Sequence, residues 1–159
     1  MTKVTVIALG KLKGKYLRDA SEEYLKRLSR YCKFEIIEIE PIRLPENPSN
    51  AQISAALEKE ADLIEKRIPK NTLLATLCIE GRQVTSEKFS ETVNRAQMYS
   101  GGITFVIGSS FGLAERVKQS ADIRLSFSEM TFPHQLFRIM LLEQIYRAFK
   151  IDEGGAYHK

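Results

Sequence analysis

Apolar residues along the chain recur at two spacings, which alternate from one end to the other. Residues 4–9 form an apolar run that Gly10 closes, whereas residues 34–39 alternate apolar with acidic side chains. Both patterns are typical of β-strands, the second with one face in water. The run at 73–79 is apolar enough for a fully buried strand, and two further strands are predicted over 103–107 and 123–127.

Between these runs, apolar side chains recur at the spacing of an α-helix. Helices are predicted over residues 15–31, 49–67, 86–99 and 113–120, and from Pro133 to about Ile151. Ser49 or Asn50 suits the N-cap of the second helix, and the fixed φ of Pro133 suits the first position of the last. The alternation predicts an α/β fold with one domain over 1–159, in which helices cover both faces of a mostly parallel sheet.

The last predicted helix carries apolar side chains around much of its circumference, from Leu136 to Phe149. A surface helix normally shows one apolar stripe, so this helix needs partners on more than one side. A chain of this length offers few such partners. We therefore expect a homodimer with this helix in the interface.

The composition is that of an ordinary globular domain. Hydrophobic residues make up 43% and charged residues 28%, which excludes a disordered or disulfide-dense chain. No apolar run approaches the ~18 residues of a membrane span, and the N-terminus lacks a signal-peptide pattern.

Cys32 and Cys78 are expected to be reduced, buried thiols of a cytoplasmic protein. No metal site is expected, because His134 and His158 lie far apart and have no cysteine partners.

The net charge of +4 is unevenly distributed along the chain. Residues 1–33 hold nine basic and three acidic side chains, whereas residues 34–100 hold eight basic and eleven acidic. The basic excess is explained either by a solvated helix face or by a patch that attracts phosphate groups.

Glycine and serine follow three of the predicted strands, at Gly81, at 108–112 and at 126–134. The carboxyl ends of parallel strands meet at one edge of the sheet, where ligands bind in such folds. An ordinary turn explains each glycine alone, but together they favour a nucleotide-sized cleft. Residues 10–16 are too short for a P-loop, and residues 108–112 lack the GxGxxG pattern of dinucleotide-binding folds.

Several segments together resemble the ribosomal large subunit methyltransferase H family, in order and spacing along the whole chain. They are GKLK at 10–13, IEG at 79–81, FVIG at 105–108, GL at 112–113, LSFS at 125–128, MTFPHQL at 130–136, EQIYRA at 143–148 and YH at 157–158. The MTFPHQ and EQIYRA blocks are the most specific.

The resemblance implies a SPOUT-class enzyme that uses S-adenosyl-L-methionine to methylate N3 of a pseudouridine in 23S rRNA of assembled ribosomes. It also implies a homodimer and a C-terminal trefoil knot, which rests on the resemblance alone because knots are nearly absent from proteins. The implied methyl-donor contacts are Leu77, Gly108, Phe127, Ser128, Glu129, Met130, Thr131 and Phe132. Ser109 stands where the family usually has glycine, and a positive φ there would cost roughly 1–2 kcal/mol.

Methylation at N3 requires that the imide proton be accepted or the resulting anion stabilised. With the resemblance as guide, His158 is the candidate proton acceptor, Arg147 the candidate anion stabiliser or phosphate clamp, and Tyr157 a stacking partner for the base. Each has a plainer alternative. Tyr157 and His158 could belong to a frayed C-terminus, and Arg147 could form an ion pair with Glu143. His134 is explained as an ordinary residue in the first turn of a helix.

Other functions stay open at this point. An RNA-binding module without catalysis would use the basic N-terminal helix and need no donor cleft. An enzyme that binds ATP or NAD would need motifs that are absent from the sequence. Within the methyltransferases, a tRNA substrate is the strongest competitor.

Overall fold

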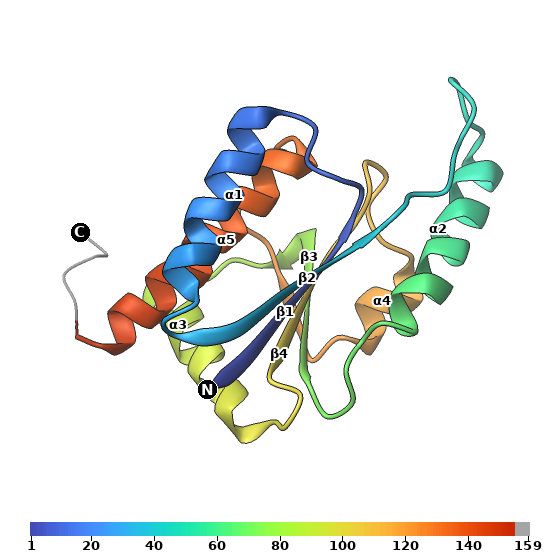
Figure 1. Ribbon diagram of the computed structural model, residues 1–159. Helices are drawn as coiled ribbons and strands as arrows, with labels where there is room; N and C mark the ends of the chain where they lie inside the picture. The colour runs from blue at the N-terminus through green and yellow to red at the C-terminus, as the bar shows by residue number, and fades with distance from the viewer. Residues whose placement is uncertain (155–159) are drawn as a thin grey trace.

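Five strands form one sheet in which every neighbouring pair runs parallel, in the order β2-β1-β4-β3-β5. The computed structural model describes residues 1–154 of the chain (Figure 1). The strands are β1 Thr2–Leu9, β2 Cys32–Ile39, β3 Leu73–Arg82, β4 Ile103–Ile107 and β5 Ile123–Leu125. This confirms the predicted parallel sheet, which is in fact entirely parallel.

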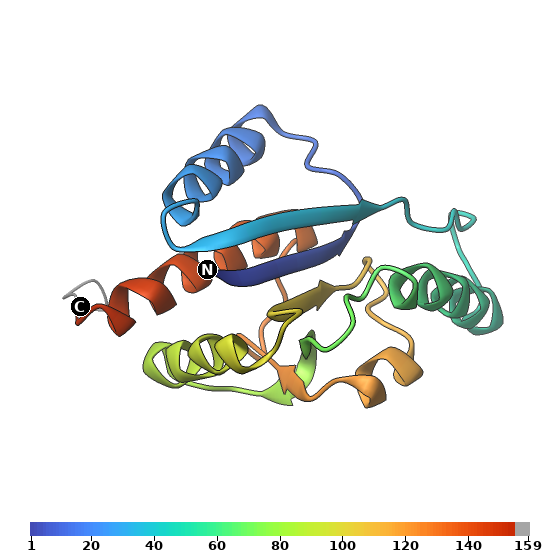
Figure 2. The same ribbon diagram turned by 60° about the horizontal axis from the view of Figure 1, so that its bottom comes forward.

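Helices cover both faces of the sheet. They are α1 Lys15–Leu28, α2 Asn50–Glu65, α3 Ser86–Arg95, α4 Glu115–Ser120 and α5 His134–Asp152, with a short 3-10 helix, η1, at Ala96–Met98. Helices α1, α3 and α5 lie on one face, and α2 and α4 on the other (Figures 1 and 2). The predicted α/β fold is therefore confirmed, although the helix expected at 86–99 tightens into η1 for its last turn.

Alternation along the strands builds a separate apolar core on each face. In β1, Val4 and Val6 belong to the core under α1, α3 and α5, whereas Ile7 and Leu9 belong to the core under α2 and α4. Successive side chains of a strand point to opposite faces, so a strand buried on both faces is apolar at most positions, with Thr5 the buried polar residue of β1.

The N-terminus of α2 is set by a reciprocal pair of hydrogen bonds. The Ser49 hydroxyl accepts from the backbone N–H of Gln52 at 3.1 Å, and the Gln52 side chain accepts from the backbone N–H of Ser49 at 2.8 Å. This capping box satisfies two otherwise free amides and identifies Ser49, rather than Asn50, as the N-cap.

Strand β3 is longer than predicted and is only partly buried. It extends to Arg82, and its end leaves the core, so that Ile79 is 55% exposed. The pairing with β5 explains this change, because its register shifts between Leu77 and Arg82. The expectation of a fully buried strand over 73–79 is therefore wrong for its last residues.

Helix α5 finds several of its partners within the chain. It packs against both α1 and α3 (Figures 1 and 2), and Leu141, Leu142 and Ile145 are fully buried. At its end, Phe149 stacks on Tyr31 with ring centroids 5.7 Å apart. Two helices and the sheet thus cover much of the apolar circumference of α5, whereas Leu136 is 42% exposed. The homodimer with α5 in its interface stays a prediction.

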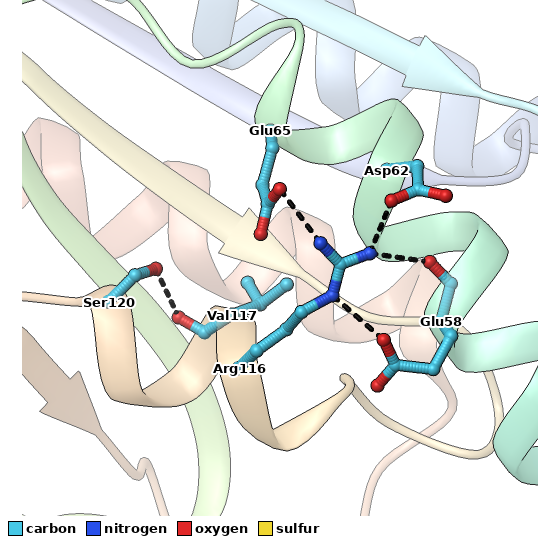
Figure 3. A network of polar contacts seen from close by, with 6 residues as sticks. All are labelled: Glu58, Asp62, Glu65, Arg116, Val117 and Ser120. Carbon is cyan, nitrogen blue, oxygen red and sulfur yellow. Dashed lines mark hydrogen bonds and ion pairs between the residues drawn. The ribbon is translucent and has the colours of Figure 1, made fainter.

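Helix α4 is short, and one arginine ties it to α2. The Arg116 guanidinium contacts the carboxylates of Glu58, Asp62 and Glu65 at 2.8, 2.5 and 2.9 Å (Figure 3). All four side chains are at least partly exposed, but one guanidinium shared by three carboxylates forms a network rather than an isolated surface pair. This network holds α4, and with it the turn that leads into α4 from β4.

A buried arginine joins the ends of β1 and β2 to the start of α5. Arg138 is 3% exposed and donates to a carboxylate oxygen of Glu38 at 2.7 Å and to the carbonyl oxygen of Gly10 at 2.9 Å. A buried cation is stable only when it is paired and hydrogen-bonded, and both conditions are met here.

We expect Arg138→Met to lower the free energy of unfolding by about 2–4 kcal/mol, because it removes charge-assisted hydrogen bonds from a buried position. Urea unfolding monitored by circular dichroism measures the change. Arg95→Met, on an exposed position of α3, should cost less than about 0.5 kcal/mol. Equal unfolding midpoints for the two variants would contradict the structural role of Arg138.

Candidate functional site

The end of β3 and the turns that follow β4 and β5 enclose one hollow of about 540 Å³ at the carboxyl edge of the sheet. We call it the main cleft. It is lined by Leu77–Glu80 of β3, Ile107 at the end of β4 with the turn 108–113, Lys118 of α4, Leu125 of β5, 126–128 and 130–133 from the connection to α5, and His134 and Phe137 of α5. The predicted convergence at one edge is therefore observed, although Glu80, expected in a turn, lies within β3.

The turn after β4 is shaped by its two glycines. The Gly112 amide donates to the Ser109 carbonyl at 2.8 Å, and Gly112 has a φ of +86°. A Cβ on Gly108 would lie 2.4 Å from the carbonyl oxygen of Gly112, so only glycine allows this approach.

Ser109 causes no backbone strain in this turn. Among the described residues, Asn71 is the one non-glycine with a positive φ, so the cost considered for Ser109 does not arise. Its hydroxyl instead donates to the Glu60 carboxylate of α2 at 3.0 Å. Glu60 is 3% exposed and also accepts from the backbone amide of Ile42 at 3.0 Å. One buried carboxylate thus joins this turn to the proline-containing loop before α2.

Hydrogen bonds of its own serines fix the conformation of the segment after β5. The Ser126 hydroxyl donates to the Ser128 carbonyl at 3.0 Å, and the Ser128 hydroxyl accepts from the Met130 amide at 3.0 Å. Phe127 packs against Phe137 of α5, with ring centroids 4.8 Å apart. These contacts fold the segment over the cleft and give it an apolar wall.

The charged groups of the main cleft are largely neutralised. Lys118 forms an ion pair with Glu80 at 2.5 Å, and the hydrogen bond from Lys118 holds the pKa of Glu80 below its usual value. Burial, followed by the charge of Glu80, raises the pKa of the Cys78 thiol, which therefore stays protonated and is a poor nucleophile. Burial, followed by the positive charges of Arg138 and Lys13, lowers the pKa of His134, so its imidazole is neutral at pH 7.

The two cysteines are both free, as predicted, but only one is fully buried. Cys32 lies in the core, where burial raises the pKa of its thiol to about 12, whereas Cys78 is partly exposed at the cleft. The expectation of two buried thiols is thus correct for Cys32 and wrong for Cys78. The register shift that lifts the end of β3 out of the core also accounts for Cys78.

The structure brings together most of the residues implied as donor contacts. Leu77, Gly108, Phe127, Ser128, Met130, Thr131 and Phe132 line the main cleft, whereas Glu129 does not. The sequence analysis missed Lys118 and Phe137. The helical spacing of Phe137 from His134 could have indicated its direction, but nothing in the sequence pairs Lys118 with Glu80.

Of the three candidate catalytic residues, the structure describes only Arg147. The Arg147 guanidinium donates to the Glu143 carboxylate at 2.7 Å, which confirms the ion pair considered for it, and Arg147 does not line the main cleft. Tyr157 and His158 lie outside the described residues.

Two features are absent from the described residues. Within residues 1–154, His, Cys, Asp and Glu side chains form no group of three that suits a metal ion. No helix of this part of the chain is long and apolar enough to span a membrane.

Comparison with known proteins identifies the family. The family model described as "Predicted SPOUT methyltransferase" matches residues 2–158. "Ribosomal RNA large subunit methyltransferase H 1" of Clostridium perfringens (strain SM101 / Type A) is 52% identical over 157 residues, which cover 98% of this chain and 99% of that protein. "Ribosomal RNA large subunit methyltransferase H" of Clostridium botulinum (strain Kyoto / Type A2) is 48% identical with the same coverage.

A solved structure of a probable methylase family protein from Haemophilus influenzae Rd KW20 has the same fold. It aligns with a TM-score of 0.58 at 12% identity, covering 95% of this chain and 68% of that one. The match over almost the whole length and the identity near one half lead to one conclusion. The chain belongs to the SPOUT methyltransferase family, and within it to the ribosomal RNA large subunit methyltransferase H family.

Proposed function

We propose that residues 1–159 act as one SPOUT methyltransferase domain that transfers a methyl group from S-adenosyl-L-methionine to N3 of a pseudouridine in 23S rRNA. The substrate is the assembled ribosome, which locates the enzyme in the cytoplasm. One observation carries the proposal: family motifs at the end of β3 and in the turns after β4 and β5 enclose a single cleft of about 540 Å³. A C-terminal trefoil knot stays part of the prediction.

The residues of the main cleft fit this methyl donor. Its volume lies within the range of small-molecule sites, and apolar side chains such as Leu77, Leu125 and Phe127 suit an adenine ring. The close approach at Gly108 exposes backbone in the turn to a ligand. When bound, S-adenosyl-L-methionine would supply a methyl group activated by its sulfonium charge.

A nucleoside triphosphate suits the cleft less well. Among residues 1–154, Lys118 is the only lysine or arginine in the lining of the main cleft, and it is already paired with Glu80. A triphosphate brings several negative charges, which sites of that class meet with lysine and a Gly-rich loop of backbone amides. The rival of an ATP-binding enzyme is therefore disfavoured by the charges as well as by the sequence.

The position of Arg147 supports a composite site made by two copies of the chain. Arg147 follows His134, which lines the main cleft, by thirteen residues of one helix, a distance of roughly 20 Å along its axis. Arg147 therefore cannot contact a base bound at the cleft of its own chain. If it stabilises the N3 anion, it does so at the cleft of a partner copy, together with Tyr157 and with His158 as proton acceptor.

Apolar side chains at the rim of the cleft provide a second argument for a homodimer. Met130 and Phe132 are exposed on the segment that leads into α5, and Leu136 is exposed in the first turn of α5. Contiguous exposed apolar residues are typical of interaction surfaces. Because Met130 and Phe132 line the cleft, a second copy that covers them would also bring its own residues close to the donor.

We expect Gly108→Ala to weaken binding of S-adenosylhomocysteine at least about tenfold, because the new Cβ would collide with the Gly112 carbonyl and displace the turn. Isothermal titration calorimetry measures the dissociation constant. Gly14→Ala is the matched control, since Gly14 has a φ of −87° and its near neighbour is the exposed side chain of Tyr16. Equal affinities for both variants would contradict the proposed donor site.

The activity is tested with ribosomes from a strain that lacks the gene. The purified protein should transfer a labelled methyl group from S-adenosyl-L-methionine to 23S rRNA, and mass spectrometry should place it on a pseudouridine. Labelling of tRNA instead would support the competing substrate, and binding of ribosomes without any transfer would support an RNA-binding module.

His158→Ala and Arg147→Ala should each lower kcat, by about 100-fold for the proton acceptor, while donor binding changes little. Lys150→Ala is the control on α5, because it removes a positive charge one turn beyond Arg147. Single-turnover kinetics and calorimetry separate the two effects. Full activity in both variants would show that other residues carry the proton and charge.

The homodimer is tested by sedimentation equilibrium at micromolar concentration, where the mass should be twice 18.1 kDa. Leu136→Asp should shift this mass toward the monomer, since it places a charge in the proposed interface. Met98→Asp changes an exposed residue of η1 and should leave the mass unchanged. A wild-type mass of one chain would end the composite-site model.

A further inference from the structure

We propose that a second hollow, next to the main cleft, binds the nucleotide of the RNA that accepts the methyl group. This hollow has a volume of about 580 Å³. It is lined by Leu9–Lys11, Lys13, Glu38–Ile42, Leu44, Ala56, Leu57, Glu60, Ser109–Phe111, His134 and Gln135. The inference rests on the proposed function and adds to it the place where the substrate binds.

The order of the strands favours a ligand at this place. Strands β1 and β4 are neighbours, but α1, which follows β1, and α4, which follows β4, cover opposite faces of the sheet (Figures 1 and 2). The two connections therefore diverge and leave a crevice beyond the carboxyl ends of the strands. Ligands of open α/β sheets bind at such switch points. The second hollow lies there, between Leu9 at the end of β1 and Ser109 after β4.

The second hollow also shares a wall with the main cleft. Ser109, Ser110, Phe111 and His134 line both. Methyl transfer requires the acceptor nitrogen and the methyl carbon to lie about 3–3.5 Å apart, so an acceptor site must open onto the donor site. A third hollow, near Lys3 and Lys70, shares no lining residue with the main cleft and lies at the opposite edge of the sheet.

Two lysines of the second hollow are available for phosphate groups. Lys11 and Lys13 are exposed, and the ion pairs formed among residues 1–154 do not include either side chain. Their loop is held in place by two side chains. The Gln135 side chain accepts from the Lys13 amide at 2.7 Å, and Arg18 donates to the Lys13 carbonyl at 2.9 Å. The ammonium groups therefore stand on an anchored loop.

The carboxylates of the second hollow do not cancel these charges. Glu38 is paired with buried Arg138, and Glu60 is buried and accepts two hydrogen bonds from the protein. Glu40 is exposed. Its exposed carboxylate can accept hydrogen bonds from ribose hydroxyls or base N–H groups.

The shared wall offers groups that suit a base. Phe111 is 49% exposed although it is a large apolar residue. Exposed aromatic rings serve as stacking platforms in sites that bind single-stranded RNA. His134, which is neutral at pH 7, presents an imidazole that can accept a hydrogen bond from a base N–H.

The test compares Lys11→Ala/Lys13→Ala with Lys66→Ala/Lys70→Ala. The control pair is exposed near the amino end of β3, at the opposite edge of the sheet. With labelled donor and ribosomes, the Lys11/Lys13 variant should raise KM for ribosomes at least tenfold, with kcat within about twofold and donor affinity unchanged. The slope of log KM against log salt should fall by about one for each lysine that contacts a phosphate.

A binding assay separates this inference from the proposed reaction. Fluorescence anisotropy of labelled His158→Ala protein with ribosomes from the same strain needs no methyl transfer. Loss of binding only in the Lys11/Lys13 variant would support the second hollow even if no methylation were detected. Equal behaviour of the two double variants, or no ribosome binding by the unaltered chain, would overturn it.

Phe111 provides a second readout. Phe111→Ala should raise KM for ribosomes about tenfold, and Phe111→Tyr should restore it, because an aromatic ring in the same place can stack on a base. Failure of tyrosine to restore KM, together with unchanged donor binding, would remove Phe111 from the site.

Discussion

All five strands of the sheet run in the same direction, so every turn that follows a strand emerges at one edge. This constraint determines where the protein can bind a ligand. The end of β3 and the turns after β4 and β5 enclose the main cleft, and the ends of β1, β2 and β4 border the second hollow. The opposite edge contains the loops that enter the strands. Parallel pairing thus brings the motifs that line the main cleft, from Leu77 to His134, to one side of a small chain.

Buried polar groups hold the turns at this edge in fixed positions relative to the strands and helices. Arg138 connects α5 to the ends of β1 and β2, and Glu60 connects the turn after β4 to the loop before α2. Turns carry few apolar contacts of their own, so specific hydrogen bonds from buried charges compensate for the missing core. A charged group in such a position is costly unless all its partners are present. The shape of this edge therefore depends on all of these hydrogen bonds together.

The sequence predicted the fold closely and the site in part. Apolar periodicity identified each strand and helix, and the glycines after the strands indicated where the cleft lies. The exposed end of β3 was missed because an apolar run does not reveal a register shift with β5. The partners of α5 were missed because periodicity shows that a helix is covered but not by what. Glu60 escaped notice since a glutamate within a charged helix gives no sign that it is buried.

In the turn after β4, the glycines and the residues between them have different roles, and this determines which positions can be substituted. Gly108 and Gly112 determine the course of the backbone, the first through a close approach and the second through its positive φ. The three residues between them, 109–111, have ordinary backbone angles, and all three line both hollows. Natural variation or engineering can therefore exchange Ser110 and Phe111, and so change which molecules bind, while the loop keeps its path. Ser109 is more constrained, because its hydroxyl donates to the buried Glu60 carboxylate.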